Sequence, residues 1–104
     1  MQIKRPFLRH FVIETSGESK DLNSIAWLHR KVKILVKSLG VTSIKRIYHK
    51  FSPQGISLVY ILSASHAALH SWPEENYLHI DLVTCTKNIE LSDVKSAING
   101  CLIR

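Results

Sequence analysis

Residues 65–84 read SHAALHSWPEENYLHIDLVT. The first eight residues alternate in part between polar and apolar side chains, and the Pro-Glu-Glu-Asn segment at 73–76 is a turn signal. The last eight residues match a second strand. This stretch therefore predicts two strands, at 65–72 and 77–84, joined by a short turn.

Another hairpin is expected immediately before this one. Apolar positions alternate imperfectly over 41–51, and 56–62 is a largely apolar run. The Ser-Pro-Gln-Gly segment at 52–55 separates them and is typical of a turn. Strands are therefore predicted on both sides of that turn.

The N-terminal part combines a strand with a helix. Residues 8–15 are rich in β-forming side chains and are followed by a Ser-Gly-Glu-Ser turn signal. A helix follows, with Asp21 as its expected N-cap and Gly40 as its C-terminal stop. Its apolar residues repeat at helical spacing, at Ile25, Leu28, Val32, Leu35 and Leu39.

A last helix is predicted over 92–99, ended by Gly100, with at most a short strand over 101–103. Its inward-facing residues would be Val94, Ala97 and Ile98. The order of elements predicts an α+β two-layer sandwich, in which an antiparallel sheet carries two helices on one face. At 104 residues the chain is expected to form a single domain, 1–104.

Composition predicts a cytoplasmic protein. No run approaches the 18 or so apolar residues of a membrane span, and the basic, polar start lacks the apolar segment of a secretory signal. Two cysteines, Cys85 and Cys101, form no disulfide framework, and a reducing cytosol would keep both as thiols.

The net charge of +6 is concentrated in the first half of the chain, where a nucleic-acid surface is one reading. The basic residues there also fit the outer, solvated face of the first helix. We therefore expect no nucleic-acid partner, and salt-dependent binding to any duplex would contradict this. The residues concerned are Arg30, Lys31, Lys33 and Lys37.

Reactive side chains are unusually dense from Ser65 onward. They are Ser65, His66, His70, Trp72, Glu74, Tyr77, Asp81, Thr84 and Cys85. The run resembles the pattern E-S-H-x3-H-[ST]-W-P-E-x2-Y-x3-D-x2-T-C of the S-adenosylmethionine decarboxylase proenzyme family of bacteria and archaea. Ala64 stands where that pattern has glutamate.

The resemblance implies a chain that cleaves itself between Ala64 and Ser65, giving residues 1–64 (the β chain) and 65–104 (the α chain). Ser65 would become a pyruvoyl group, which forms a Schiff base with the amine of S-adenosylmethionine and withdraws electrons while carbon dioxide leaves. It also implies a two-layer protomer that forms a homodimer, with active sites near the subunit interface.

Roles for individual residues follow from the same resemblance. Ser57 and His70 match the processing serine and histidine, which stabilise the cleavage oxyanion and remove the α-proton of Ser65. Cys85 matches the catalytic acid that returns a proton after decarboxylation.

Substrate-binding roles follow from the resemblance too. Phe51 matches the position that stacks on adenine, and Glu74 matches the carboxylate that accepts hydrogen bonds from the ribose hydroxyls. Trp72 lines the same pocket or anchors the core. Structural roles are expected for His10, Tyr77 and Asp81, and His66 is left without a role.

Three alternatives remain open. A pyruvoyl enzyme could instead decarboxylate an amino acid such as arginine or ornithine. A non-cleaving homologue could act as a binding or regulatory partner, an idea motivated by Ala64 and the short C-terminal end. The H-x3-H spacing of His66 and His70, with Glu74 and His79, could bind a metal. No metal is expected, because two residues four apart on a strand lie roughly 13 Å apart.

Overall fold

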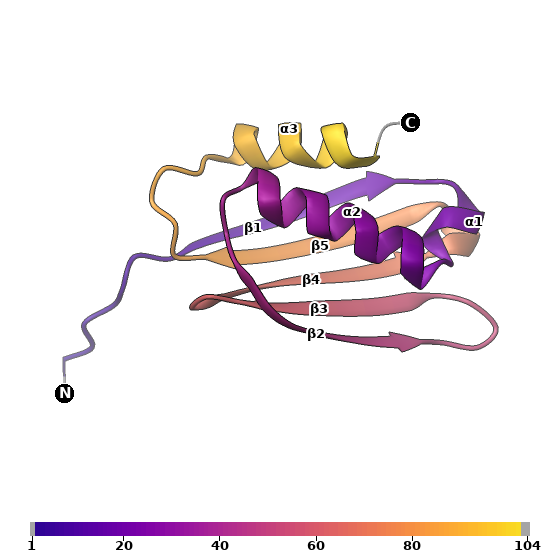
Figure 1. Ribbon diagram of the computed structural model, residues 1–104, viewed down its shortest axis with the longest axis horizontal. Coiled ribbons are helices and arrows are strands. Elements are labelled where there is room, and N and C mark those ends of the chain that lie inside the picture. The colour runs from indigo at the N-terminus through magenta and orange to yellow at the C-terminus, as the bar shows by residue number, and fades with distance from the viewer. Residues whose placement is uncertain (1, 103–104) are drawn as a thin grey trace.

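The computed structural model describes residues 2–102, which form an antiparallel sheet with helices on one face (Figure 1). The sheet order is β1-β5-β4-β3-β2. Its strands are β1 (Arg9–Ser16), β2 (Ser43–Lys50), β3 (Ile56–Leu62), β4 (Ser65–Trp72) and β5 (Tyr77–Thr84). The helices are α1 (Ser19–Leu22), α2 (Ile25–Ser38), the short 3-10 turn η1 (Pro73–Glu75) and α3 (Leu91–Leu102). The predicted two-layer α+β architecture is confirmed, with α1 in addition.

Alternation along the strands gives the sheet one buried and one open face. In β3, β4 and β5 every second side chain is buried against α2 and α3, because successive strand residues point to opposite faces. The side chains between them form the open face, which no element of the described chain covers (Figure 1). The open face consists of His10, Val12, Glu14, Lys45, Ile47, His49, Ser57, Val59, Ile61, His66, Ala68, His70, Trp72, Tyr77, His79, Asp81 and Val83.

Helix α2 begins later than the sequence indicated. Asp21 lies inside α1, and the N-cap of α2 is Ser24, whose hydroxyl accepts a hydrogen bond from the Trp27 amide at 3.1 Å. The Asp21 prediction was wrong because the chain forms a separate helical turn before the longer helix. Gly40 does end α2: it has a φ of 70°, which suits glycine, and its amide bonds the Lys37 carbonyl.

Helix α3 extends beyond its predicted end. It continues through Gly100 to Leu102, so the helix stop at Gly100 and the short strand at 101–102 were wrong, while residue 103 lies outside the described residues. Glycine inside a helix costs only about 1 kcal/mol, which packing can outweigh. Val94 and Ile98 supply that packing, since both are buried as predicted, and Ala97 packs beside them.

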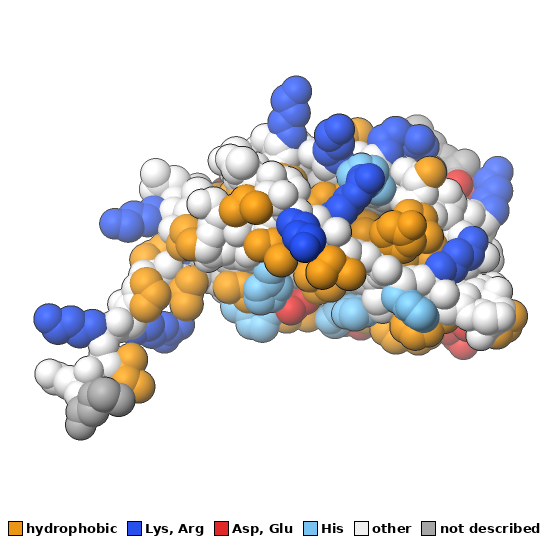
Figure 2. Space-filling model, turned by 60° about the horizontal axis from the view of Figure 1, so that its bottom comes forward, with side chains coloured by type: hydrophobic (Ala, Val, Ile, Leu, Met, Phe, Trp, Pro, Cys, Tyr) orange, Lys and Arg blue, Asp and Glu red, His pale blue; other side chains and the backbone are white. Residues whose placement is uncertain are grey.

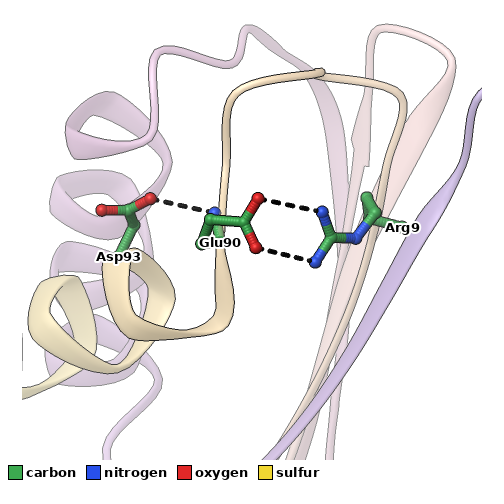
Figure 3. A network of polar contacts seen from close by, with 3 residues as sticks. All are labelled: Arg9, Glu90 and Asp93. Atoms are coloured by element: carbon green, nitrogen blue, oxygen red, sulfur yellow. Dashed lines mark hydrogen bonds and ion pairs between the residues drawn. The ribbon is translucent and has the colours of Figure 1, made fainter.

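An ion pair and a capping contact hold the segment between β5 and α3 (Figure 3). Both terminal guanidinium nitrogens of Arg9, on β1, donate to the Glu90 carboxylate at 3.3–3.4 Å. The Glu90 amide in turn donates to Asp93 at 2.9 Å, which caps the start of α3. The segment that follows β5, and with it Cys85, is therefore anchored at its far end.

Within residues 2–102, no helix is both long enough and apolar enough to cross a membrane. The stretch before β1 is extended and exposed, and it projects away from the sheet (Figure 1).

Candidate active site

The bond between Ala64 and Ser65 lies in the tight turn that joins β3 to β4. Leu62 and Ser65 are cross-strand partners, so only two residues make the turn. Ala64 has a φ of 51°, in the left-handed region that a residue with a β-carbon adopts at a cost of about 1–2 kcal/mol. The predicted cleavage point therefore directly follows a residue with an unfavourable backbone conformation, in a turn at the rim of the sheet.

Cys85 lies directly against Ser65. The Cys85 amide donates to the Ser65 hydroxyl at 3.3 Å, and its thiol sulfur is 3.8 Å from the same oxygen. The hydroxyl itself donates to the Ser63 carbonyl at 3.0 Å. Cys85 is exposed and forms no disulfide. The predicted precursor and the predicted proton donor thus form one cluster, built from the start of β4 and the end of β5.

Ser57 and His70 form a second cluster on the open face. They are direct cross-strand partners in β3 and β4, and the Ser57 hydroxyl lies 2.7 Å from Nδ1 of His70. A serine hydroxyl and an imidazole at this distance can exchange a proton and stabilise a nearby oxyanion. The structure therefore pairs the two residues assigned to processing.

Within one chain the two clusters lie apart. Ser65 and His70 are five residues apart on β4, which by strand rise is roughly 16 Å, and an odd separation puts their side chains on opposite faces. The Ser57–His70 pair therefore does not reach the Ala64–Ser65 bond of its own chain.

A cleft of about 300 Å³ contains the three predicted substrate-binding residues. Phe51 and Trp72 present aromatic rings that are 48% and 44% exposed, and Glu74 adds a carboxylate. An open cleft with two accessible rings and a carboxylate suits a flat, polar ring system bearing hydroxyl groups. Its complete lining is Phe51, Gln54, Gly55, Ile56, Ser57, His70, Ser71, Trp72 and Glu74.

Hydrogen bonds made by two residues, Gly55 and Ser71, shape this cleft. Gly55, with a φ of 106°, donates its amide to Asn23 at 3.0 Å, and its carbonyl accepts from the Phe51 amide at 2.8 Å. Ser71 is buried, and its hydroxyl accepts from the Ile56 amide and donates to the Leu22 carbonyl at 2.7 Å. Sequence reasoning missed Ser71 as a contributor, although its place in the motif, between His70 and Trp72, was a usable signal.

The remaining residues of the motif gather on the open face. His10 contacts the Asp81 carboxylate, and Nε2 of His66 lies 3.9 Å from its other oxygen. Tyr77 contacts Glu14 and His79. Among the described residues no group of three His, Cys, Asp or Glu side chains is arranged to hold a metal ion.

Histidines are the most frequent polar side chains of the open face. Five of the six in the chain lie there, and Figure 2 shows histidine side chains gathered beside hydrophobic ones along the lower part of the molecule. Several apolar side chains of this face are about half exposed, among them Val12, Ile47 and Ile61. Half-exposed apolar side chains on an uncovered sheet face are suited to contact another surface.

Comparison with known proteins identifies the family. Residues 9–102 match the family model described as S-adenosylmethionine decarboxylase. The chain belongs to the S-adenosylmethionine decarboxylase family. The resemblance inferred from the motif around Ser65 is thereby confirmed.

Individual members of the S-adenosylmethionine decarboxylase family cover most of the chain. An S-adenosylmethionine decarboxylase proenzyme of Clostridium botulinum (strain Loch Maree) is 40% identical over 95 residues, which span 90% of this chain and 82% of the relative. The proenzyme of Methanococcus maripaludis (strain S2) is 37% identical over 86 residues, spanning 82% of this chain and 70% of the relative. The fold matches the crystal structure of the Aquifex aeolicus adenosylmethionine decarboxylase, with a TM-score of 0.80 over 95% of this chain and 82% of that one, at 22% identity.

Proposed function

We propose that this chain is a self-cleaving, pyruvoyl-dependent decarboxylase of S-adenosylmethionine that works in the cytoplasm and supplies the aminopropyl donor for spermidine synthesis. The observation that carries the proposal is the contact between Ser65 and Cys85 at a strained turn, in a chain that belongs to the S-adenosylmethionine decarboxylase family. The relatives named as proenzymes support the self-cleavage.

Processing begins at the Ala64 carbonyl. The Ser65 hydroxyl attacks the carbonyl carbon, the peptide C–N bond breaks, and an ester with a free Ser65 amine remains. A base then removes the α-proton of Ser65, and the Ala64 carboxylate leaves from the β-carbon. Water replaces the nitrogen, which departs as ammonia, so that residues 1–64 end in a carboxylate and residue 65 becomes pyruvoyl.

The base and the oxyanion donor come, in this proposal, from a second copy of the chain. Ser57 and His70 lie too far from the Ala64–Ser65 bond of their own chain, and they lie on the uncovered, partly apolar open face. Pairing two open faces buries that surface and brings the processing pair of each copy to the turn of the other. The active unit is then a homodimer with two composite sites.

The substrate cleft completes each site. Phe51 and Trp72 stack on the adenine ring, and Glu74 accepts hydrogen bonds from the ribose hydroxyls. A pyruvoyl group at residue 65 supplies a carbonyl that withdraws electrons from the bond to the departing carboxylate. Cys85, whose thiol is 3.8 Å from the Ser65 oxygen, is placed to return a proton to the product.

Intact mass under denaturing conditions tests the self-cleavage. We expect the 11.9 kDa chain to appear as two fragments of roughly 7 and 4.5 kDa by residue count, the smaller one lighter by one ammonia than simple hydrolysis would give. The Ser65→Ala variant should remain whole. A wild-type chain that stays uncut through long incubation would contradict the proposal and favour a non-cleaving homologue. If the protein decarboxylated arginine or ornithine and had no activity on S-adenosylmethionine, its substrate would be an amino acid instead.

Mixed dimers test the composite site. A Ser65→Ala chain and a His70→Ala chain, carrying different tags, are inactive separately. When they are co-expressed and purified through both tags, one of the two composite sites has both residues intact, so half of the heterodimer's sites should recover activity. If each site were built from a single chain, the mixed dimer would remain inactive and its His70→Ala chain uncut.

A further inference from the structure

Trp72 is an aromatic side chain that lines the substrate cleft. It is the last residue of β4, it is 44% exposed, and the chain turns away into η1 directly after it. An exposed aromatic side chain that must stop moving to bind a ligand loses conformational entropy, and this weakens binding. A contact that holds Trp72 in place before the ligand arrives would therefore strengthen binding.

Tyr77 provides such a contact. It is the direct cross-strand partner of Trp72, with ring centroids 5.4 Å apart at an interplanar angle of 58°. Tilted aromatic pairs at this distance attract each other beyond simple burial. Tyr77 is absent from the lining of the cleft, so it supports Trp72 without occupying ligand space.

The Tyr77 ring is itself held at its hydroxyl. That hydroxyl donates to Oε2 of Glu14 at 2.8 Å and lies 3.1 Å from Nδ1 of His79. Glu14 is on β1, two strands away from β4. The hydrogen bond to Glu14, followed by burial, raises the pKa of Tyr77.

We propose that Tyr77 and Glu14 form a positioning device that holds Trp72 as a fixed wall of the nucleoside cleft. This inference rests on the proposed function, because Trp72 is assigned there to the adenine ring. Tyr77 contacts neither the Ser65–Cys85 cluster nor the Ser57–His70 pair through any of its hydrogen bonds. It is a positioning residue, and its loss changes affinity rather than the rate of the chemical step.

Steady-state kinetics with S-adenosylmethionine separates these effects. Tyr77→Phe keeps the ring and removes the hydroxyl, and Glu14→Ala removes the acceptor. Each should raise KM about three- to tenfold, the effect of one hydrogen bond, with kcat unchanged. The double variant should be no worse than either single one, since both delete the same contact.

Two variants serve as matched controls. Glu14→Gln retains an oxygen that can accept from Tyr77, so its KM should stay within about twofold of the wild-type value. Tyr48→Phe removes a hydroxyl from an exposed tyrosine on the helix side of β2, away from this contact, and should leave KM unchanged. A fall in kcat at constant KM for Tyr77→Phe would overturn the proposal and assign the hydroxyl to the chemistry.

A fluorescence measurement tests the device without any enzyme activity. In a Trp27→Phe background Trp72 is the remaining tryptophan, because the chain has two. Its emission anisotropy should fall in Tyr77→Phe and Glu14→Ala and be preserved in Glu14→Gln. Unchanged anisotropy in the first two variants would overturn the inference. If the anisotropy fell in these variants but the protein neither cleaved itself nor decarboxylated the substrate, the positioning role of Tyr77 and Glu14 would be supported and the proposed function would be contradicted.

Discussion

Ala64 carries backbone strain next to the bond that is proposed to break. Its φ of 51° is unfavourable for a residue with a β-carbon, and the peptide on its C-terminal side joins it to Ser65. Only two residues connect β3 to β4, so the turn has little freedom to relax. The proposed cleavage uses the Ala64 carbonyl rather than its side chain, so alanine in place of the glutamate of the family pattern does not prevent it.

Replacing Ala64 by glycine should stabilise the uncut chain. In a Ser65→Ala background, which prevents cleavage, we expect Ala64→Gly to raise the free energy of unfolding by up to about 1 kcal/mol, because glycine relieves the left-handed conformation. Urea unfolding measures this change. Ala68→Gly, at an ordinary position of β4, should destabilise by roughly 0.5–1 kcal/mol. Equal losses in both variants would contradict the strain at residue 64.

His29 should make stability depend on pH. Burial, then the charges of Arg46 and Lys33, lower the pKa of His29, which lies on α2 in contact with the Tyr60 hydroxyl. A folded pKa below the unfolded value of about 6.5 means that the unfolded chain binds the extra proton first. This contribution to stability is complete above about pH 6.5 and is lost as the pH falls towards the folded pKa.

The measurement is urea unfolding of Ser65→Ala protein, with and without His29→Gln, between about pH 7.5 and 5.5. The chain with His29 should lose more stability on acidification than the His29→Gln chain. The difference between the pH dependences of the free energy of unfolding of the two chains gives the contribution of His29 alone, because both chains contain the five other histidines. Parallel slopes would show that His29 titrates normally in the folded state.

At the scale of elements, the start of α2 depends on one hydroxyl. Ser24→Ala removes the acceptor for the Trp27 amide and should cost about 1 kcal/mol of stability, which thermal unfolding detects as a lower Tm. Ser38→Ala is the control, since its hydroxyl only bonds the Ile34 carbonyl within the same helix. A loss as large in Ser38→Ala would show that the effect is not one of capping.

Local signals predicted most of the elements. The strands at 56–62, 65–72 and 77–84 match β3, β4 and β5. The Ser-Pro-Gln-Gly turn precedes β3, and the Pro-Glu-Glu-Asn turn separates β4 from β5. The start of α2 and the end of α3 were misplaced. At the first point the chain forms the separate turn α1, whose Leu22 is buried, and at the second the helix continues through Gly100.

The site was predictable as a set of residues but not as an arrangement. The family resemblance proposed Ser65, Cys85, Ser57 and His70 as site residues, and the structure forms two pairs from them. Which pairs form depends on strand register, a long-range property that no local pattern encodes. One signal was available, because residues an odd number apart on a strand, such as Ser65 and His70, face opposite ways.

At the scale of the whole molecule, the proposed small fragment is the middle of the sheet. Residues 65–104 include β4 and β5, which lie between β1 on one side and β3 on the other, both from residues 1–64. We therefore expect the fragments to remain together after cleavage: one species by native mass spectrometry, and two only in denaturant. Separate elution of the fragments in native gel filtration would contradict this.

The position of the cleaved bond within the sheet also determines how mobile the new N-terminus at residue 65 is. The first residues of a chain usually fray, because nothing holds them. Here residue 65 begins an interior strand, paired with Leu62 on β3, and the next residue is paired with Val83 on β5. A reactive group formed at this terminus would therefore have the positional order of a core residue, although it is the end of a polypeptide.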